Sequence, residues 1–169
     1  MEKASEWLSS FSSIDQNQVN ALKNHEVHER KKTEIISITG GKGGVGKTSV
    51  ALKLSKTLAA SGKKVLLIDC DTNLSNTALK LGLPIDNTFY SLVSAERNFI
   101  ECLYKEDNFH LLAACNGSID LFDSKFRLED IIIDILNSHA SDYDYVFLDC
   151  PAGLSRDSLT LNAYSDKGV

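Results

Sequence analysis

The segment ITGGKGGVGKTSV, residues 38–50, contains five of the ten glycines of the chain and two lysines five positions apart. Glycines allow successive backbone N–H groups to point into one concavity, where an anionic phosphate can bind. Residues 41–48 also match the spacing G-x-x-x-x-G-K-[ST], in which a lysine and a hydroxyl residue follow the last glycine. This combination predicts a phosphate-binding loop.

The surroundings of the loop favour this interpretation over a flexible glycine turn. An apolar run at 35–39 precedes the loop, and a helix is predicted to begin at Lys47, so the positive end of that helix would face the phosphates. A plain turn explains the glycines but gives no reason for a lysine and a threonine at this register. We expect Lys47 to neutralise β- and γ-phosphate oxygens and the Thr48 hydroxyl to ligate Mg²⁺. The loop residues expected to contact a nucleotide are Gly41, Lys42, Gly43, Gly44, Val45, Gly46, Lys47, Thr48 and Ser49.

Three aspartates stand where predicted strands end. Asp69 and Asp71 follow the apolar run that begins at Val65, and Asp149 closes the run 145–149. Because ligands of open α/β sheets bind beyond the carboxyl ends of the strands, we expect these carboxylates to face the phosphate loop. An aspartate in this position is typical of a residue that holds Mg²⁺ through water, and we assign Asp149 to that role. For Asp69, the alternative is that it caps the next turn.

The rest of the sequence alternates between predicted strands and predicted helices. Continuous apolar runs at 35–39, 65–69 and 145–149 are typical of strands buried on both faces, and residues 109–114 form a weaker fourth strand. Two stripes have helical spacing: Val50, Leu54 and Leu58, and then Leu128, Ile131, Ile132, Ile135 and Leu136. The pattern predicts an α/β fold with a doubly wound, mostly parallel sheet.

Residues 1–32 differ from the remainder of the chain. Apolar residues at helical spacing are followed by a charged stretch, which predicts a short docking helix and a linker. Residues 33–169 would then form the nucleotide-binding domain. The chain ends at LNAYSDKGV, where another strand is expected to start, so we expect the C-terminal part of the sheet to be missing.

Composition restricts the class of protein. The net charge of −5 argues against a chain that coats nucleic acid, and no nucleic-acid partner is expected. No apolar run approaches the roughly 20 residues that cross a bilayer, and the N-terminus lacks the apolar stretch of a secretory signal. The four cysteines form no CxxC pair, so reduced thiols in a cytoplasmic protein are expected. A redox role for Cys70 and Cys150, which each follow an aspartate, is the alternative.

The loop resembles the deviant Walker A sequence K-G-G-x-x-G-K-[ST] of the MinD/ParA family of P-loop ATPases. Every fixed position matches, from Lys42 to Thr48. The resemblance implies that the nucleotide is ATP, and that Lys42 reaches the phosphates held by the partner subunit of a homodimer that forms across ATP. Two ammonium groups on one loop repel each other, and the phosphates of a second subunit supply the missing anion. The alternative is that Lys42 is a solvated surface lysine.

Two further segments resemble the switch regions of the same family. DCDTNLSN, residues 69–76, is similar to switch I, D-x-D-x-x-x-x-N, and DCPAGLS is similar to switch II. The resemblance implies that Asp71 positions the attacking water, that Asp69 tunes the metal and the loop, and that Asn76 helps to close the switch. It also implies that Gly153 offers its backbone N–H to the γ-phosphate. The expected activity is slow, partner-stimulated hydrolysis of ATP.

Within the family, GKKVLLIDCDTNLSNTALKLGLP and YDYVFLDCPAGLS resemble the flagellar-number regulators FlhG (FleN). Those regulators carry an N-terminal D-Q-A-x-x-L-R element that stimulates the GTPase FlhF, and here Gln18 and Leu22 match it in register. Residues 1–32 are thus expected to bind an FlhF-type partner. Peripheral attachment to the inner face of the bacterial membrane would require a C-terminal helix that this sequence lacks. The alternatives are a MinD-type division-site regulator, a ParA-type partition ATPase, or a nucleotide-binding interaction module without hydrolysis.

Overall fold

The computed structural model describes residues 32–71, 77–83, 89–93, 97–114, 127–153 and 155–169. Residues 32–169 form one compact unit, separate from residues 1–31. The predicted docking helix, with Gln18 and Leu22, lies outside the described residues, and so does Asn76.

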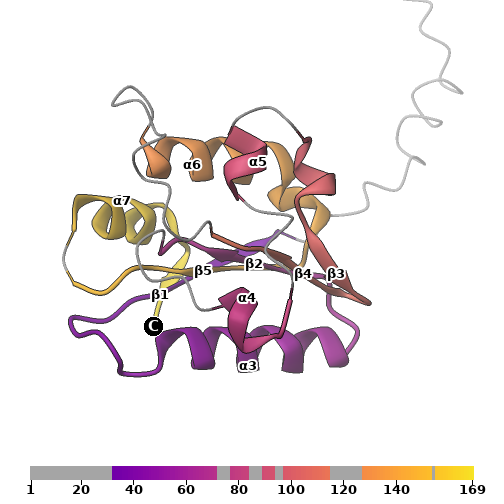
Figure 1. Ribbon diagram of the computed structural model, residues 1–169, viewed down its shortest axis with the longest axis horizontal. Coiled ribbons are helices and arrows are strands. Elements are labelled where there is room, and N and C mark those ends of the chain that lie inside the picture. Colours follow the sequence, from indigo (N-terminus) through magenta and orange to yellow (C-terminus); the bar gives the residue numbers. More distant parts are fainter. Residues whose placement is uncertain (1–31, 72–76, 84–88, 94–96, 115–126, 154) are drawn as a thin grey trace, which may run out of the picture. The chain divides into compact units, whose positions relative to one another are not determined.

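The described strands form a six-stranded sheet in the order β3-β4-β2-β5-β1-β6 (Figure 1). Neighbouring strands are parallel, except that β3 and β4 are antiparallel. The strands are β1 (Glu34–Ile38), β2 (Val65–Asp69), β3 (Tyr104–Glu106), β4 (Phe109–Leu112), β5 (Tyr145–Asp149) and β6 (Lys167–Gly168). The predicted α/β fold with a mostly parallel sheet is confirmed.

Helices cover both faces of this sheet. One face carries α3 (Lys47–Ala60) and α4 (Thr77–Lys80), as Figure 1 shows. The opposite face carries α5 (Phe89–Val93), α6 (Leu128–His139) and α7 (Arg156–Tyr164). Two short 3₁₀ helices, η1 (Phe99–Glu101) and η3 (Ala140–Asp142), complete the described elements. None of the described helices is long and apolar enough to span a bilayer.

Alternate side chains of the central strands enter two separate hydrophobic cores. Val65 and Leu67 of β2 belong to the core under α3, which we call the α3-side core. Leu66 and Ile68 belong to the core under α6 and α7, the α6-side core. All four side chains are fully buried. Burial on both faces explains the continuous apolar runs, and the predicted bounds of β2 and β5 agree with the structure at both ends.

Helix α3 packs on the sheet through Ala51, Leu52 and Ser55 rather than through the predicted stripe. Ala51 and Ser55 are fully buried, whereas Val50 is 44% exposed and Leu54 is 40% exposed. Only Leu58 of the predicted stripe packs against the α3-side core. The small side chains of Ala51 and Ser55 allow the helix to lie close to the sheet and Leu52 enters the core beside them, whereas Val50 and Leu54 fall on the more exposed side of the helix. The interpretation of Val50 and Leu54 as part of a core-facing stripe is therefore wrong.

Two edge strands complete the sheet. The strand expected to start near the end of the sequence is β6, which pairs with β1 in parallel. Strand β3 was not predicted, and it forms a hairpin with β4 around Asp107, whose φ is 50°. The sheet therefore has more strands than the four that the sequence indicated.

Candidate functional site

The glycine-rich loop connects the carboxyl end of β1 to the first turn of α3. Gly46 is the N-cap residue of α3, with φ 96° and ψ 13°, and Gly44 has φ 77°. Side chains other than glycine rarely adopt this left-handed conformation, so the backbone itself requires these two glycines. A Cβ atom added at Gly41 or Gly43 would meet no other atom within 4 Å. Packing thus gives no reason for glycine at these two positions, whereas the close approach of a ligand would.

Two lysines of the loop lie at the positive end of α3. The side chain of Lys47 passes over Gly40, where an added Cβ would be 3.2 Å from Lys47 Cδ. Lys42 is exposed on the loop. The first turn of α3 contains no acidic residue, and the ion pairs among the described residues include neither lysine. An anion bound here would gain both from the ammonium groups and from the helix dipole.

Asp69 and Asp149 are neighbours at the carboxyl ends of β2 and β5. They are register partners in the sheet, and each is only 2% exposed. The Oδ1 atom of Asp69 accepts a hydrogen bond from the backbone N–H of Asp71 at 3.1 Å. The capping alternative for Asp69 is therefore correct for one of its oxygens, and this bond also fixes the start of the segment that carries Asp71.

The carboxyl group of Asp149 has a strongly raised pKa. Burial raises its pKa to about 6, and the nearby charges of Asp69 and Asp71 also raise it. A hydrogen bond from the Thr48 side chain and the charge of Lys47 act in the opposite direction. Within the described part of the chain, its Oδ1 atom is buried without a hydrogen-bond partner. A buried acceptor without a partner is costly, so this atom fits a cation or a cation-bound water.

These donors suit a magnesium ion better than a metal that needs an all-protein cage. No group of three His, Cys, Asp or Glu side chains that could hold a metal occurs among the residues the structure describes. Mg²⁺ prefers oxygen ligands, keeps several waters and uses one or two carboxylates together with substrate phosphates. Thr48 and Asp149 offer a hydroxyl and a carboxylate oxygen, and the loop beside them is suited to phosphates.

Backbone hydrogen bonds connect the ends of three strands to the loop. The N–H of Cys70 donates to the carbonyl of Asp149 at 3.0 Å, and the N–H of Cys150 donates to the carbonyl of Ile38 at 3.1 Å. The Gly153 N–H donates to the carbonyl of Gly40 at 3.0 Å. The group predicted to bind a γ-phosphate therefore lies beside the loop but is already engaged by it.

Cys70 and Cys150 are buried, unoxidised thiols directly below the site. A hydrogen bond with Cys150, followed by burial, raises the pKa of the Cys70 thiol well above its usual value. Both side chains are 1% exposed and belong to the α6-side core. Because the thiolate is the reactive form, this environment opposes redox chemistry and favours a packing role.

One residue near the loop was not predicted from the sequence. The Nζ atom of Lys80, the last residue of α4, donates to Ser49 Oγ at 3.2 Å. The contact joins residues 31 positions apart, and no local pattern around Lys80 indicates it.

Comparisons with known proteins agree with this fold. A family model described as an AAA domain matches residues 33–167. An uncharacterized ATP-binding protein of Methanocaldococcus jannaschii is 36% identical over 135 residues, which cover 79% of this chain and 50% of that protein. The septum site-determining protein MinD of Bacillus subtilis is 32% identical over 139 residues, which cover 80% of this chain and 52% of MinD.

A solved structure gives the same result for the fold. MinD of Pyrococcus horikoshii, complexed with Mg-ADP, has a TM-score of 0.67 and 30% sequence identity, over 81% of this chain and 56% of that chain. The chain thus spans about half the length of the curated relatives that it matches.

Proposed function

Because this chain belongs to the AAA domain family and, within it, to the MinD/ParA P-loop ATPases, we propose that it binds and hydrolyses Mg-ATP. The reaction would drive a switch that dimerises around the nucleotide. The observation that carries the proposal is the buried Oδ1 atom of Asp149, which has no partner among the described residues and lies in a site with Thr48 and Lys47. The P. horikoshii relative was solved with Mg-ADP, which supports the same ligand class here.

The loop residues bind the phosphates in this proposal. Backbone N–H groups of residues 41–49 surround the β-phosphate, and Lys47 neutralises β- and γ-oxygens. Thr48 and Asp149 are the residues that would hold Mg²⁺, the first through its hydroxyl and the second through water. When bound, the ion neutralises charge that develops on the terminal phosphates. Asp149 must be ionised for this role, and the positive charge of Lys47 favours the ionised form.

Asp71 positions the water that attacks the γ-phosphate. The backbone N–H of Asp71 donates a hydrogen bond to Asp69 Oδ1. Asp69 therefore positions Asp71 and does not itself contact the substrate. Asn76 would help to close the same segment over the nucleotide. The backbone N–H of Gly153 donates to the carbonyl of Gly40 in the structure. In this proposal it leaves that carbonyl and donates to the γ-phosphate instead.

Lys42 acts on the nucleotide of a second subunit. It is exposed on the loop, so its ammonium is free to extend to a partner. In the homodimer, the added cation stabilises charge at the γ-phosphate, as an arginine finger does in other phosphoryl-transfer enzymes.

Light scattering with saturating Mg-ATP tests this proposal. We expect wild-type dimers, and we expect Lys42→Ala to remain a monomer that still binds ATP. Lys53→Ala removes the same charge from an exposed position on α3, outside the loop, and should dimerise normally. Identical monomers for wild type and Lys42→Ala, with normal ATP binding, would favour an interaction module without turnover.

For the biological output, we propose control of flagellar number or placement, with residues 1–32 stimulating an FlhF-type GTPase in the cytoplasm. The support is the likeness of the switch segments to FlhG and the match at Gln18 and Leu22. Division-site placement is the second candidate, because MinD proteins are among the relatives. A peptide of residues 1–32 should accelerate the GTPase, and its Gln18→Ala variant should not. A deletion strain with normal flagella and misplaced septa would favour the second candidate.

A further inference from the structure

Lys80 is held beside the phosphate loop by an anchored short helix. Ala78 of α4 is 7% exposed and packs in the α3-side core together with Ala51 of α3. The backbone N–H of Leu81 donates to the carbonyl of Thr77 at 3.2 Å, and Gly82, with φ 65°, then ends the helix. Figure 1 shows α4 on the same face of the sheet as α3. The position of Lys80 therefore follows from core packing and helix geometry.

The electrostatic surroundings of Lys80 are unfavourable in the absence of an anion. Its ammonium contacts Ser49 in the first turn of α3, where the helix dipole is positive, and Lys42 and Lys47 belong to the loop that leads into the same turn. A cation at this end of a helix is unfavourable, because the helix dipole is positive there. The described ion pairs do not include Lys80.

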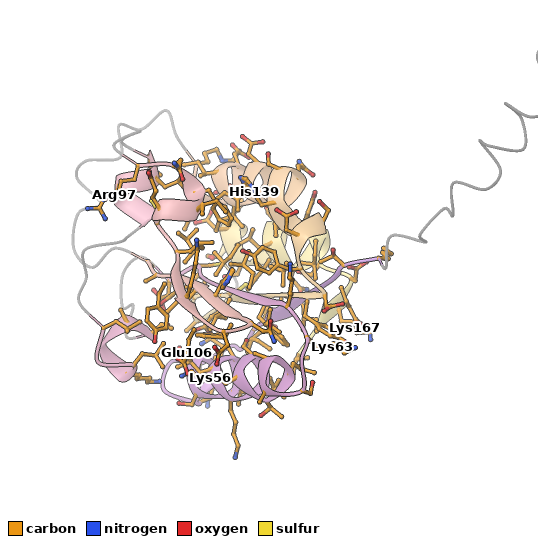
Figure 2. All side chains as sticks on the ribbon, turned by 90° about the vertical axis from the view of Figure 1, so that its right-hand side faces the viewer. Lys56, Lys63, Arg97, Glu106, His139 and Lys167 are labelled. Atoms are coloured by element: carbon orange, nitrogen blue, oxygen red, sulfur yellow. The ribbon has the colours of Figure 1, made fainter. Side chains whose placement is uncertain are left out.

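Lys56 of α3, unlike Lys80, has an acidic partner among the described residues. Lys56, farther along the helix, forms an ion pair with Glu106 of β3 at 2.9 Å, and Figure 2 shows the two side chains pointing toward each other. Lys80, in contrast, faces the neutral hydroxyl of Ser49, the residue that follows Thr48, and the Thr48 side chain in turn hydrogen-bonds to the buried carboxylate of Asp149. The ammonium groups of Lys42, Lys47 and Lys80 need an anion, whereas the carboxylate of Asp149 needs a cation. A metal-bound polyphosphate supplies both.

We propose that Lys80 is a further nucleotide-binding residue, which contributes a third cation to the phosphate chain of a nucleoside di- or triphosphate. The inference rests on the proposed function, because it assumes a nucleotide in the loop. Ser49 orients the ammonium, and α4 connects it to the segment that follows Asp71. Since Lys47 and Thr48 already serve the γ-phosphate side, Lys80 acts on phosphates that ADP and ATP share.

Calorimetric titration of the full chain with Mg-ADP tests this inference without any contribution from hydrolysis or dimerisation. An exposed charge pair contributes up to about 1 kcal/mol, so Lys80→Met should raise the Kd of Mg-ADP by about threefold to fivefold. Lys80→Arg should bind within twofold of wild type. The difference between wild type and Lys80→Met should shrink in high salt, because exposed charges are screened.

Lys53→Met is the matched control for general electrostatics. Lys53 is an exposed lysine of α3 away from the loop, and its replacement should leave the Kd unchanged. Without nucleotide, the melting temperature of Lys80→Met should be equal to that of wild type or slightly higher, because the change removes a cation from the positive end of α3, while the shift that Mg-ADP produces should be smaller in this variant.

Two outcomes separate the possible failures. If wild type binds no nucleotide, both the proposed function and this inference are wrong. If wild type binds Mg-ADP but Lys80→Met binds it equally well, or Lys53→Met loses as much affinity, only the role of Lys80 is refuted.

Discussion

Replacing Asp149 with asparagine should stabilise the protein when nucleotide and magnesium are absent. Burial holds the pKa of this carboxyl at about 6 instead of the ordinary 3.8. That difference corresponds to about 3 kcal/mol of destabilisation once the folded protein must keep the carboxylate ionised. An asparagine amide carries no charge, but its buried NH₂ group needs acceptors, and one unsatisfied donor costs about 1–3 kcal/mol. Asp69 lies beside it and can accept one of these bonds, so we expect a net gain of about 1–2 kcal/mol.

The pH dependence follows from the direction of the shift. Between pH 3.8 and about 6, the folded protein binds more protons at Asp149 than the unfolded chain does, so rising pH removes stability. The destabilisation that the ionised Asp149 carboxylate causes is complete above pH 6 and absent well below pH 3.8. The advantage of Asp149→Asn should therefore be large at pH 7.5 and should decline as the pH is lowered toward 4.

Urea unfolding in EDTA at pH 7.5 and pH 4.5 measures this directly. The matched control is Asp142→Asn, which changes an exposed aspartate and should leave the midpoint unchanged. Adding Mg-ADP should reverse the order of wild type and Asp149→Asn, because only wild type gains stability from a bound metal–nucleotide pair. A variant less stable than wild type in EDTA at pH 7.5, or equally favoured at both pH values, would refute the reasoning.

Three glycines give further predictions. Gly46→Ala forces an alanine to φ 96°, so it should cost about 1–2 kcal/mol in urea unfolding and abolish nucleotide binding; Gly41→Ala, in open surroundings, should weaken binding without loss of stability. Gly168→Ala would place a Cβ 2.6 Å from Asn162 Oδ1, which accepts a hydrogen bond from Ser37 at 2.6 Å. This change should cost about 1 kcal/mol and increase amide exchange in β6, and unchanged exchange would contradict it.

The central strands could be predicted because their burial leaves a continuous signal in the sequence. Every residue of β2 is buried, so its bounds are visible as an apolar run, and β5 shows the same pattern. Strand β3 consists of Tyr104, Lys105 and Glu106 at the edge of the sheet, and their side chains carry no such signal. Only the pairing with β4 defines it.

The site was predicted as far as chain order determines it. The loop and Asp149 meet because parallel strands bring their carboxyl ends to one edge, which the sequence implies. The buried face of α3 depends on how close Ala51 and Ser55 allow the helix to approach the sheet, and periodicity alone does not contain that distance. The contact between Lys80 and Ser49 depends in the same way on where α4 packs.

The division of the interior by the sheet has a consequence for how substitutions combine. Helix α3 and the loop rest on one hydrophobic cluster, while α6 and α7 rest on the other, and the backbone of β2 and β5 lies between them. Free-energy changes from truncating Leu67 and Leu66, neighbours in sequence on opposite faces, should then be nearly additive despite their proximity. Substitutions in the α6-side core should thus leave the packing of α3 on its own core undisturbed.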